Sequence, residues 1–189
     1  MTPPFNVNEY GEGFGDLLRE TRINPLDGGT ANAGARERLE GLSPDTAFAG
    51  KSIVDEAMAQ TCRSAIWLYH NFLDESHTLS QKIDTTTGSF WHGIMHRREP
   101  DFSNAKYWFQ KVGDHETFPS IREAAAELAS EAGGAAGTLA DELWDPFALV
   151  DLCEAGLAGD SSLDQLCRQV QQKEWEILFD YSYTKATGR

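Results

Sequence analysis

Apolar residues recur at steps of three and four along much of this chain, which is the period of an amphipathic helix. The first such run follows Lys51 and consists of Met58, Cys62, Ile66, Tyr69 and Leu73. It predicts a helix of at least about 18 residues that continues through Leu73. The segment TTTGS at 85–89 is expected to break the chain after it.

Two shorter helices are predicted on either side of Pro100. The segment 90–99 has a helical pattern and must end before Pro100, because the residue that precedes a proline avoids the α region. The segment 101–113 begins with Asp or Ser as the N-cap, and it ends at Gly113.

Capping signals predict two helices further along the chain. One spans 120–133 and opens with a capping box at Ser120. The other spans 145–156, where Asp145 is the expected cap and Pro146 occupies the first helical position.

A last helix is predicted over 161–181, where apolar residues keep helical spacing almost throughout. No stretch alternates apolar and polar residues for long enough to form a convincing strand. We therefore predict an all-α fold in which antiparallel helix hairpins pack as a single helical domain over 36–189. Residues 1–35 are rich in glycine and lack periodicity, so they are predicted to form an irregular N-terminal arm.

Two segments, 67–84 and 91–113, share a weak internal repeat. Each contains a tryptophan, a short helix, an Asp-x-Ser start and a later Gln-Lys pair. The second copy resembles a tetratricopeptide repeat at Trp91, Ile94, Ala105 and Phe109, although two copies are fewer than such arrays need. This likeness supports one function, a protein-interaction module that binds a peptide and has no catalytic activity.

The charge balance limits the partners of the chain. Sixteen Lys and Arg residues stand against thirty Asp and Glu residues, which gives a net charge of −14. A field of that sign repels phosphate backbones and anionic lipids, so we expect no nucleic-acid partner and no membrane surface.

The N-terminus lacks the pattern of a secretory signal, and a cytoplasmic protein is predicted. Three widely spaced cysteines, Cys62, Cys153 and Cys167, are expected to be small buried residues.

Candidate chemistry gathers in one segment, since all five histidines fall between residues 70 and 115. His92, His96 and Glu99 are four and three residues apart, which places them within about 60° of one helix face. Two imidazoles and a carboxylate on one face can bind one divalent metal ion, so these three residues are the predicted metal ligands. The competing interpretation is a solvated face on which Glu99 offsets nearby arginines.

A second group has similar spacing. His70, Asp74 and His77 stand at i, i+4 and i+7 if one helix continues through Leu73. Asp74 is equally suited to be an N-cap, which would divide that face.

The two adjacent arginines are expected to differ. Arg98 falls near the centre of the apolar arc of its helix, so we expect it to be buried and paired with a carboxylate such as Glu75, Asp101 or Asp114. Arg97 falls on the other side and is expected to be exposed, with a contribution under about 1 kcal/mol.

Three segments of the chain are distinctive, namely DESHTLSQKID, SFWHGIMHRREPDFSNAKYWFQKVGDHETFP and WDPFALVDLCEAG. They resemble an uncharacterised family of small soluble proteins in bacteria and fungi, over roughly residues 50–185. The resemblance implies no activity.

The main functional prediction is a polar pocket between the two hairpins that binds a small anionic ligand or a divalent metal. Its expected lining is His70, His77, His92, His96, Arg97, Arg98, Glu99 and Asp101. If the site is catalytic, a histidine would act as general base while an arginine holds an anionic group, or a bound metal would assist hydrolysis.

Overall fold

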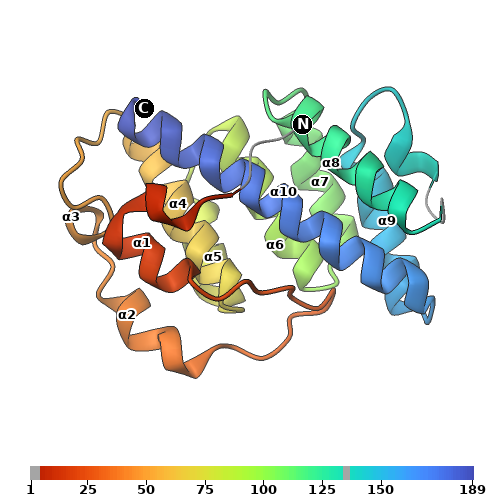
Figure 1. Cartoon of the computed structure of the whole chain (residues 1–189), viewed down its shortest axis with the longest axis horizontal. Helices are drawn as coiled ribbons and strands as arrows, with labels where there is room; N and C mark the ends of the chain where they lie inside the picture. The colour runs from red at the N-terminus through yellow and green to blue at the C-terminus, as the bar shows by residue number, and fades with distance from the viewer. Residues whose placement is uncertain (1–4, 134–136) are drawn as a thin grey trace.

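The longest helix of the chain, α10 (Ser161–Thr187), runs along the long axis of the molecule, and the other helices pack around it (Figure 1). The structure, a computed structural model, describes residues 5–133 and 137–189. The other α-helices are α1 (Gly11–Leu18), α2 (Arg36–Glu40), α3 (Pro44–Ala47), α4 (Glu56–Tyr69), α5 (Leu73–Ser80), α6 (Thr86–Arg98), α7 (Phe102–Val112), α8 (Phe118–Glu131) and α9 (Pro146–Leu157). The 3-10 helices are η1 (Val7–Tyr10), η2 (Ala33–Ala35) and η3 (Gly137–Ala140).

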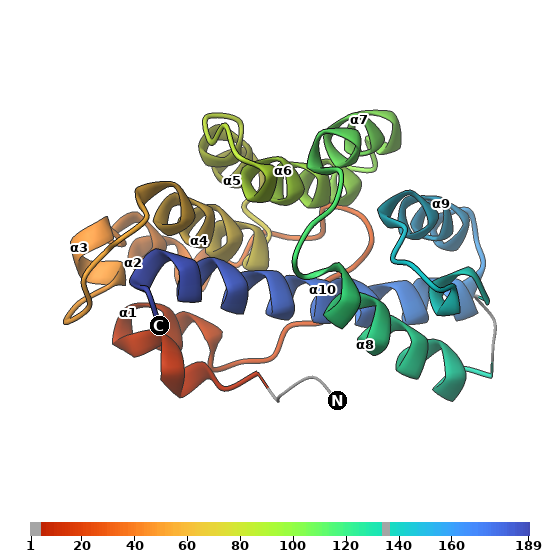
Figure 2. The same ribbon diagram turned by 90° about the horizontal axis from the view of Figure 1, so that it is seen from above.

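The helices form two sides around α10. Seen from above, α1 and α8 lie on one side, and α4, α5, α6 and α7 lie on the other (Figure 2). Over the described residues there is no strand, so the predicted all-α fold is confirmed. The three cysteines are free and buried, as their spacing predicts.

The predicted helix through Leu73 is wrong, because the chain turns sharply after Tyr69. Helix α4 ends there, and Asn71 adopts a left-handed backbone conformation with φ of 62° before α5 begins. Asparagine tolerates this region better than most residues. Its side chain also holds the turn, since Nδ2 donates to the carbonyl oxygen of Thr30 at 3.1 Å. The face that would carry His70 together with His77 therefore does not form.

Two helix starts also differ from the sequence pattern. Helix α6 begins in the TTTGS segment rather than after it, because the Thr85 side chain accepts a hydrogen bond from the backbone N–H of Gly88. Helix α8 begins before Ser120, with Thr117 as its N-cap and a proline in its first turn. The start of α9 at Pro146, capped by Asp145, is as predicted.

The N-terminal arm contains a helix that its glycine-rich sequence does not announce. Helix α1 buries Phe14, whose ring meets that of Phe179 on α10 edge-on at 5.4 Å. The Tyr10 hydroxyl donates to Asp180 at 3.0 Å, which adds a second link to α10. The expectation of an irregular arm over 1–35 is therefore wrong at α1, and residues 1–4 lie outside the described part. The domain boundary at residue 35 stays a prediction.

Helix α6 is the most enclosed helix of the fold, because every residue from Thr87 to Arg98 is buried. Its polar side chains must therefore find partners inside the protein. The Trp91 indole N–H donates to Ser182 at 3.1 Å, and the Arg97 guanidinium pairs with the Glu174 carboxylate, both on α10.

The prediction that Arg97 is exposed is wrong. Its side chain and that of Glu174 are both 0% exposed, and Gln171 accepts a further hydrogen bond from Arg97 Nε at 2.9 Å. The ring of Phe109 lies 5.6 Å from the guanidinium carbon. The division of α6 into an apolar and a solvent-exposed face fails because the helix has neighbours on all sides. Which way a charged side chain points therefore depends on where its partner lies.

Arg98 is buried as predicted, but its partner is not a carboxylate. Its Nη2 atom donates to Asn71 Oδ1 at 2.7 Å, and both Nε and Nη2 lie 3.3 Å from the carbonyl oxygen of Asp27. Among the described residues no carboxylate contacts this guanidinium, which corrects the expected pairing. Two neutral oxygens thus hold a buried cation.

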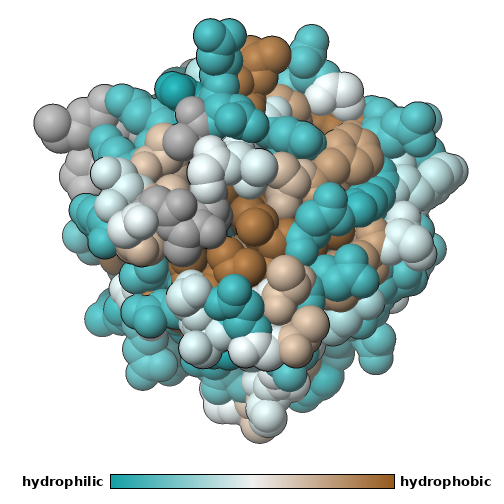
Figure 3. All heavy atoms as spheres, turned by 90° about the vertical axis from the view of Figure 1, so that its right-hand side faces the viewer, coloured by the Kyte–Doolittle hydropathy of each residue, from teal (hydrophilic) through white to brown (hydrophobic). Residues whose placement is uncertain are grey.

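The surface is mainly polar. Figure 3 views the end of the molecule that lies at the right of Figure 1, where polar atoms surround a small central apolar area. The exposed large apolar side chains of the described part are Ile23, Val54, Tyr107, Leu143 and Leu157. None of the described helices combines the length and the apolar composition of a membrane span.

We predict that Arg97→Met lowers the free energy of unfolding by about 3–5 kcal/mol, because it leaves the Glu174 carboxylate buried without its counter-charge. The double variant Arg97→Met with Glu174→Leu should recover much of that loss, since no buried charge remains. Urea denaturation of the wild type and the two variants provides the measurement. A loss under about 1 kcal/mol for Arg97→Met would show an exposed pair instead.

Candidate functional site

Three histidines converge where α5, α6 and α7 meet. His77 comes from α5, and His92 and His96 come from successive turns of α6. One ring nitrogen from each lies within 4.8 Å of the other two. The closest approach joins the Nε2 atoms of His92 and His96, which are 3.0 Å apart.

The local sequence explains this convergence. Residues four apart lie one above the other on a helix, which brings His92 beside His96. The short connection after α5 folds that helix back against α6, so the ring of His77 lies with its centroid 4.7 Å from that of His92 and 5.3 Å from that of His96.

The outer ring nitrogens of the two buried histidines are both held by hydrogen bonds. Ser80 Oγ lies 2.7 Å from His92 Nδ1, and this hydroxyl also faces the carbonyl oxygen of His77 at 3.4 Å. Glu99 Oε2 lies 3.1 Å from His96 Nδ1. Because an ionised carboxylate only accepts, His96 donates through Nδ1 and keeps the lone pair on Nε2. When the Ser80 hydroxyl donates to the His77 carbonyl, His92 likewise donates through Nδ1.

In that arrangement two nitrogen lone pairs face each other at 3.0 Å. Such a contact is repulsive unless a cation lies between the two atoms. Around a tetrahedral zinc ion with typical Zn–N bonds, neighbouring nitrogens are roughly 3.3 Å apart. The separation of this pair is close to that value, whereas the ligand nitrogens of all three histidines lie within 4.8 Å of one another. The cluster therefore has the donor set of a metal site, and His92 and His96 have the spacing of two ligands.

Burial keeps these imidazoles neutral, which is the form that binds metal. Burial, together with neighbouring His96, His77 and Lys111, lowers the pKa of His92 to about 3. Burial also lowers the pKa of His96, and Glu99 opposes that shift. His92 is 1% exposed and His96 is 5% exposed, whereas His77 is only partly buried. The open side of the site is therefore next to His77.

Helix α7 covers the other side of the cluster. The Trp108 ring lies with its centroid 4.1 Å from that of His92, and the Lys111 ammonium sits 4.2 Å from the Trp108 centroid. The Asn104 side-chain nitrogen Nδ2 lies 3.1 Å from His96 Nε2, so its N–H donates to the lone pair on Nε2, and a metal ion bound there would have to displace this contact.

The structure brings together only some of the predicted site residues. Glu99 is not in position to be a metal ligand, because it is the C-cap of α6 and its carboxylate faces the outer nitrogen of His96. His77 takes the third place. Asp101 caps α7 by accepting from the backbone N–H of Asn104 at 3.3 Å.

His70 and the two arginines lie elsewhere. His70 Nε2 bonds the carbonyl oxygen of Leu17 at 2.9 Å, and its Nδ1 is 3.0 Å from the Asn32 amide, so this residue fastens the N-terminal arm to the end of α4. Arg97 and Arg98 point away to Glu174 and Asn71, as described above. The expected single pocket that combines histidines and arginines does not form.

Ser80 is the site residue that the sequence analysis missed. It stands three residues after His77 on α5, and residues three apart share a helix face. That spacing could have identified it, but only with the knowledge that α5 packs against His92.

Comparisons with protein-family models, curated proteins and solved structures found no match. The resemblance to a family of small bacterial and fungal proteins therefore stays a prediction.

The buried histidines predict a dependence of stability on pH. Burial is the largest cause that lowers the pKa of His70 to about 4, of His92 to about 3 and of His115 to about 4. Each is therefore neutral in the folded protein at pH values where it is protonated in the unfolded chain. Unfolding takes up protons between about pH 6.5 and about pH 4 for His70 and His115, and down to about pH 3 for His92, so the free energy of unfolding should fall as the pH falls through that window.

The slope should reach about 1.4 kcal/mol per pH unit for each such histidine. Urea denaturation in the presence of a chelator measures it, and proton NMR of the His92 ring separates histidines from carboxylates. A His92 resonance that titrates near pH 6.5 in the folded protein would contradict this account.

Proposed function

We propose that this protein binds one divalent transition-metal ion, of the zinc class, through His77, His92 and His96. The observation that carries the proposal is the approach of two Nε2 atoms to 3.0 Å while both Nδ1 atoms are held from outside. Metal-binding histidines characteristically donate their other ring nitrogen to a carboxylate, a carbonyl or another acceptor, which fixes the ring and the tautomer. Glu99 and Ser80 supply this support.

Three imidazoles leave one position of a tetrahedral ion open, as in catalytic zinc sites. The partly exposed His77 places that position on the solvent side, which also provides a path for entry. When bound, such an ion would supply Lewis-acid chemistry and an activated water, and metal-assisted hydrolysis is the reaction class that this chemistry supports. Two buried ligands, His92 and His96, with one partly exposed ligand, His77, suit a metal ion that must reach a substrate from solvent.

Two observations favour the metal over the other predicted functions. The separation of Arg97 and Arg98 from the cluster removes the expected anion-binding groups from this site. The hairpins α4–α5 and α6–α7 also have α10 against them, since the Trp175 indole of α10 donates to the carbonyl of Ala65 and Ser182 accepts from Trp91. A peptide would have to displace that helix, so the interaction module stays an untested alternative.

The first test is metal binding by protein purified without an affinity tag. Calorimetry with zinc should give one site per chain. His77→Ala should abolish or greatly weaken zinc binding, because it removes one of the three ligands. The variant should still fold, since this partly exposed side chain contributes little to the core. Glu99→Gln should weaken binding about 10–100-fold, because the His96 ring loses a charged acceptor.

Glu75→Gln is the matched control. Glu75 and Glu99 both have 32% of the side chain exposed, and each accepts a hydrogen bond from a cationic or imidazole group, Arg36 in the case of Glu75. We expect zinc affinity equal to that of the wild type for this control.

The alternative is that the Ser80 hydroxyl donates to His92 Nδ1. His92 Nε2 then donates to His96 Nε2, and an ordinary hydrogen bond explains their closeness without a metal. The absence of any zinc binding would overturn the proposal.

A further inference from the structure

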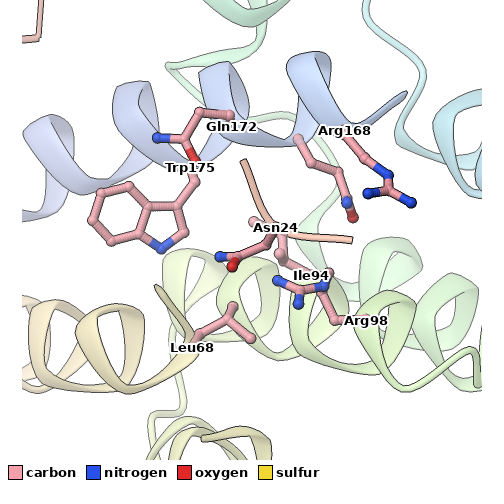
Figure 4. Close-up of a pocket in the computed structure, with 8 residues that line it drawn as sticks. Asn24, Leu68, Ile94, Arg98, Arg168, Gln172 and Trp175 are labelled. Atoms are coloured by element: carbon pink, nitrogen blue, oxygen red, sulfur yellow. The ribbon is translucent and has the colours of Figure 1, made fainter. Parts of the chain in front are cut away.

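A second polar site lies between α4, α6 and α10, apart from the histidine cluster. It is a small cavity of about 20 Å³. Its polar wall includes Arg98, Arg168 and Gln171, and its apolar wall is formed by Leu68, Ile94 and Trp175. Figure 4 shows Arg98 reaching from α6 toward Asn24, with Trp175 directed from α10 into the same space.

The cavity contains one positive charge that forms no ion pair among the described residues. Arg168 is paired with Asp164 at 2.7 Å, and Arg97 is paired with Glu174. Arg98, which is 4% exposed, contacts only neutral oxygens among the described residues. Burial and the neighbouring Arg97 lower the pKa of the Arg98 guanidinium to about 10, and the Asp27 carboxylate opposes that shift without forming an ion pair, so the guanidinium is still charged at neutral pH.

A buried hydrogen-bond donor also lacks a partner there. Gln171 Oε1 accepts from Arg97 Nε at 2.9 Å, and this contact fixes the orientation of the amide. Gln171 Nε2 is consequently the free end, and it is buried without a hydrogen-bond acceptor. Gln171 is 7% exposed, and a buried donor left without a partner destabilises the folded protein.

We propose that this cavity binds a small monovalent anion of the halide class, with chloride as the natural occupant. An anion there would offset the Arg98 charge and accept from Gln171 Nε2, so a single ligand would satisfy both groups. Space limits the choice, because about 10–15 Å³ is the minimum for one water and this cavity is little larger. Chloride is larger than water but is a single atom, whereas phosphate or a metabolite carboxylate is far larger. A water molecule in the same place would accept the hydrogen bond but would bring no negative charge to Arg98.

The test measures thermal stability as sodium chloride replaces sodium gluconate at constant ionic strength, in the presence of a chelator so that the histidine site has no influence. We expect Tm to rise by at least about 2 °C with chloride, since a ligand that binds only the folded state stabilises it. Bromide should act similarly. Equal Tm values in chloride and gluconate would overturn the proposal.

The variant Gln171→Glu gives a sharper result. It keeps the oxygen that accepts from Arg97 and replaces the free amide nitrogen with a carboxylate oxygen, so the protein supplies its own anion. Tm without chloride should exceed that of the wild type, and the chloride dependence should disappear. Gln110→Glu is the control, because Gln110 is an exposed glutamine on α7 and the same charge change there should leave the chloride effect intact.

Crystals grown in bromide locate the ion independently of any variant. An anomalous peak within hydrogen-bond distance of Arg98 and Gln171 Nε2 is expected. A peak elsewhere, or a water at this position in bromide, would show that the salt effect has another origin and would overturn the assignment.

Discussion

The enclosure of α6 is the constraint on which the rest of this structure depends. A helix buried on every side cannot turn its polar residues to water, so each must meet a partner from a different neighbour. Arg97 meets Glu174 on α10, Arg98 meets the turn at Asn71, and His92 meets Ser80 on α5. These pairs point in different directions around one helix axis, and together they set where α10, α5 and the α4–α5 turn lie. The charged and imidazole groups of α6 therefore specify packing as much as its apolar groups do.

Sequence reasoning was most reliable where local chemistry decides the structure. Asp145 with Pro146 marks the start of α9, since a cap and a proline act within one turn. It failed where distant contacts decide. The left-handed Asn71 is held by Thr30 and Arg98, and α1 is held by the aromatic side chains of α10, so neither has a strong signal in its own segment.

The candidate site divides in the same way. The spacing of His92 and His96 predicts their closeness, because four residues make about one helical turn. The third histidine comes from another helix, and the supporting Ser80 belongs with it, so both depend on how α5 packs against α6. The predicted exposure of Arg97 is wrong for the same reason, because the arc of α6 opposite its apolar residues faces α10 and not water.

The contacts of α10 with the N-terminal arm have a consequence for how this chain is made. Tyr10 and Glu9 are joined to Asp180 and Arg189, and the backbone N–H of Val54 donates to the carbonyl of Ala186 at 2.8 Å. Segments at opposite ends of the sequence thus share one core, and a nascent chain on the ribosome has the early helices without the helix that covers them. Until α10 has emerged, their apolar faces are open to chaperones and to neighbouring chains, so this core closes only after its last helix has been synthesised.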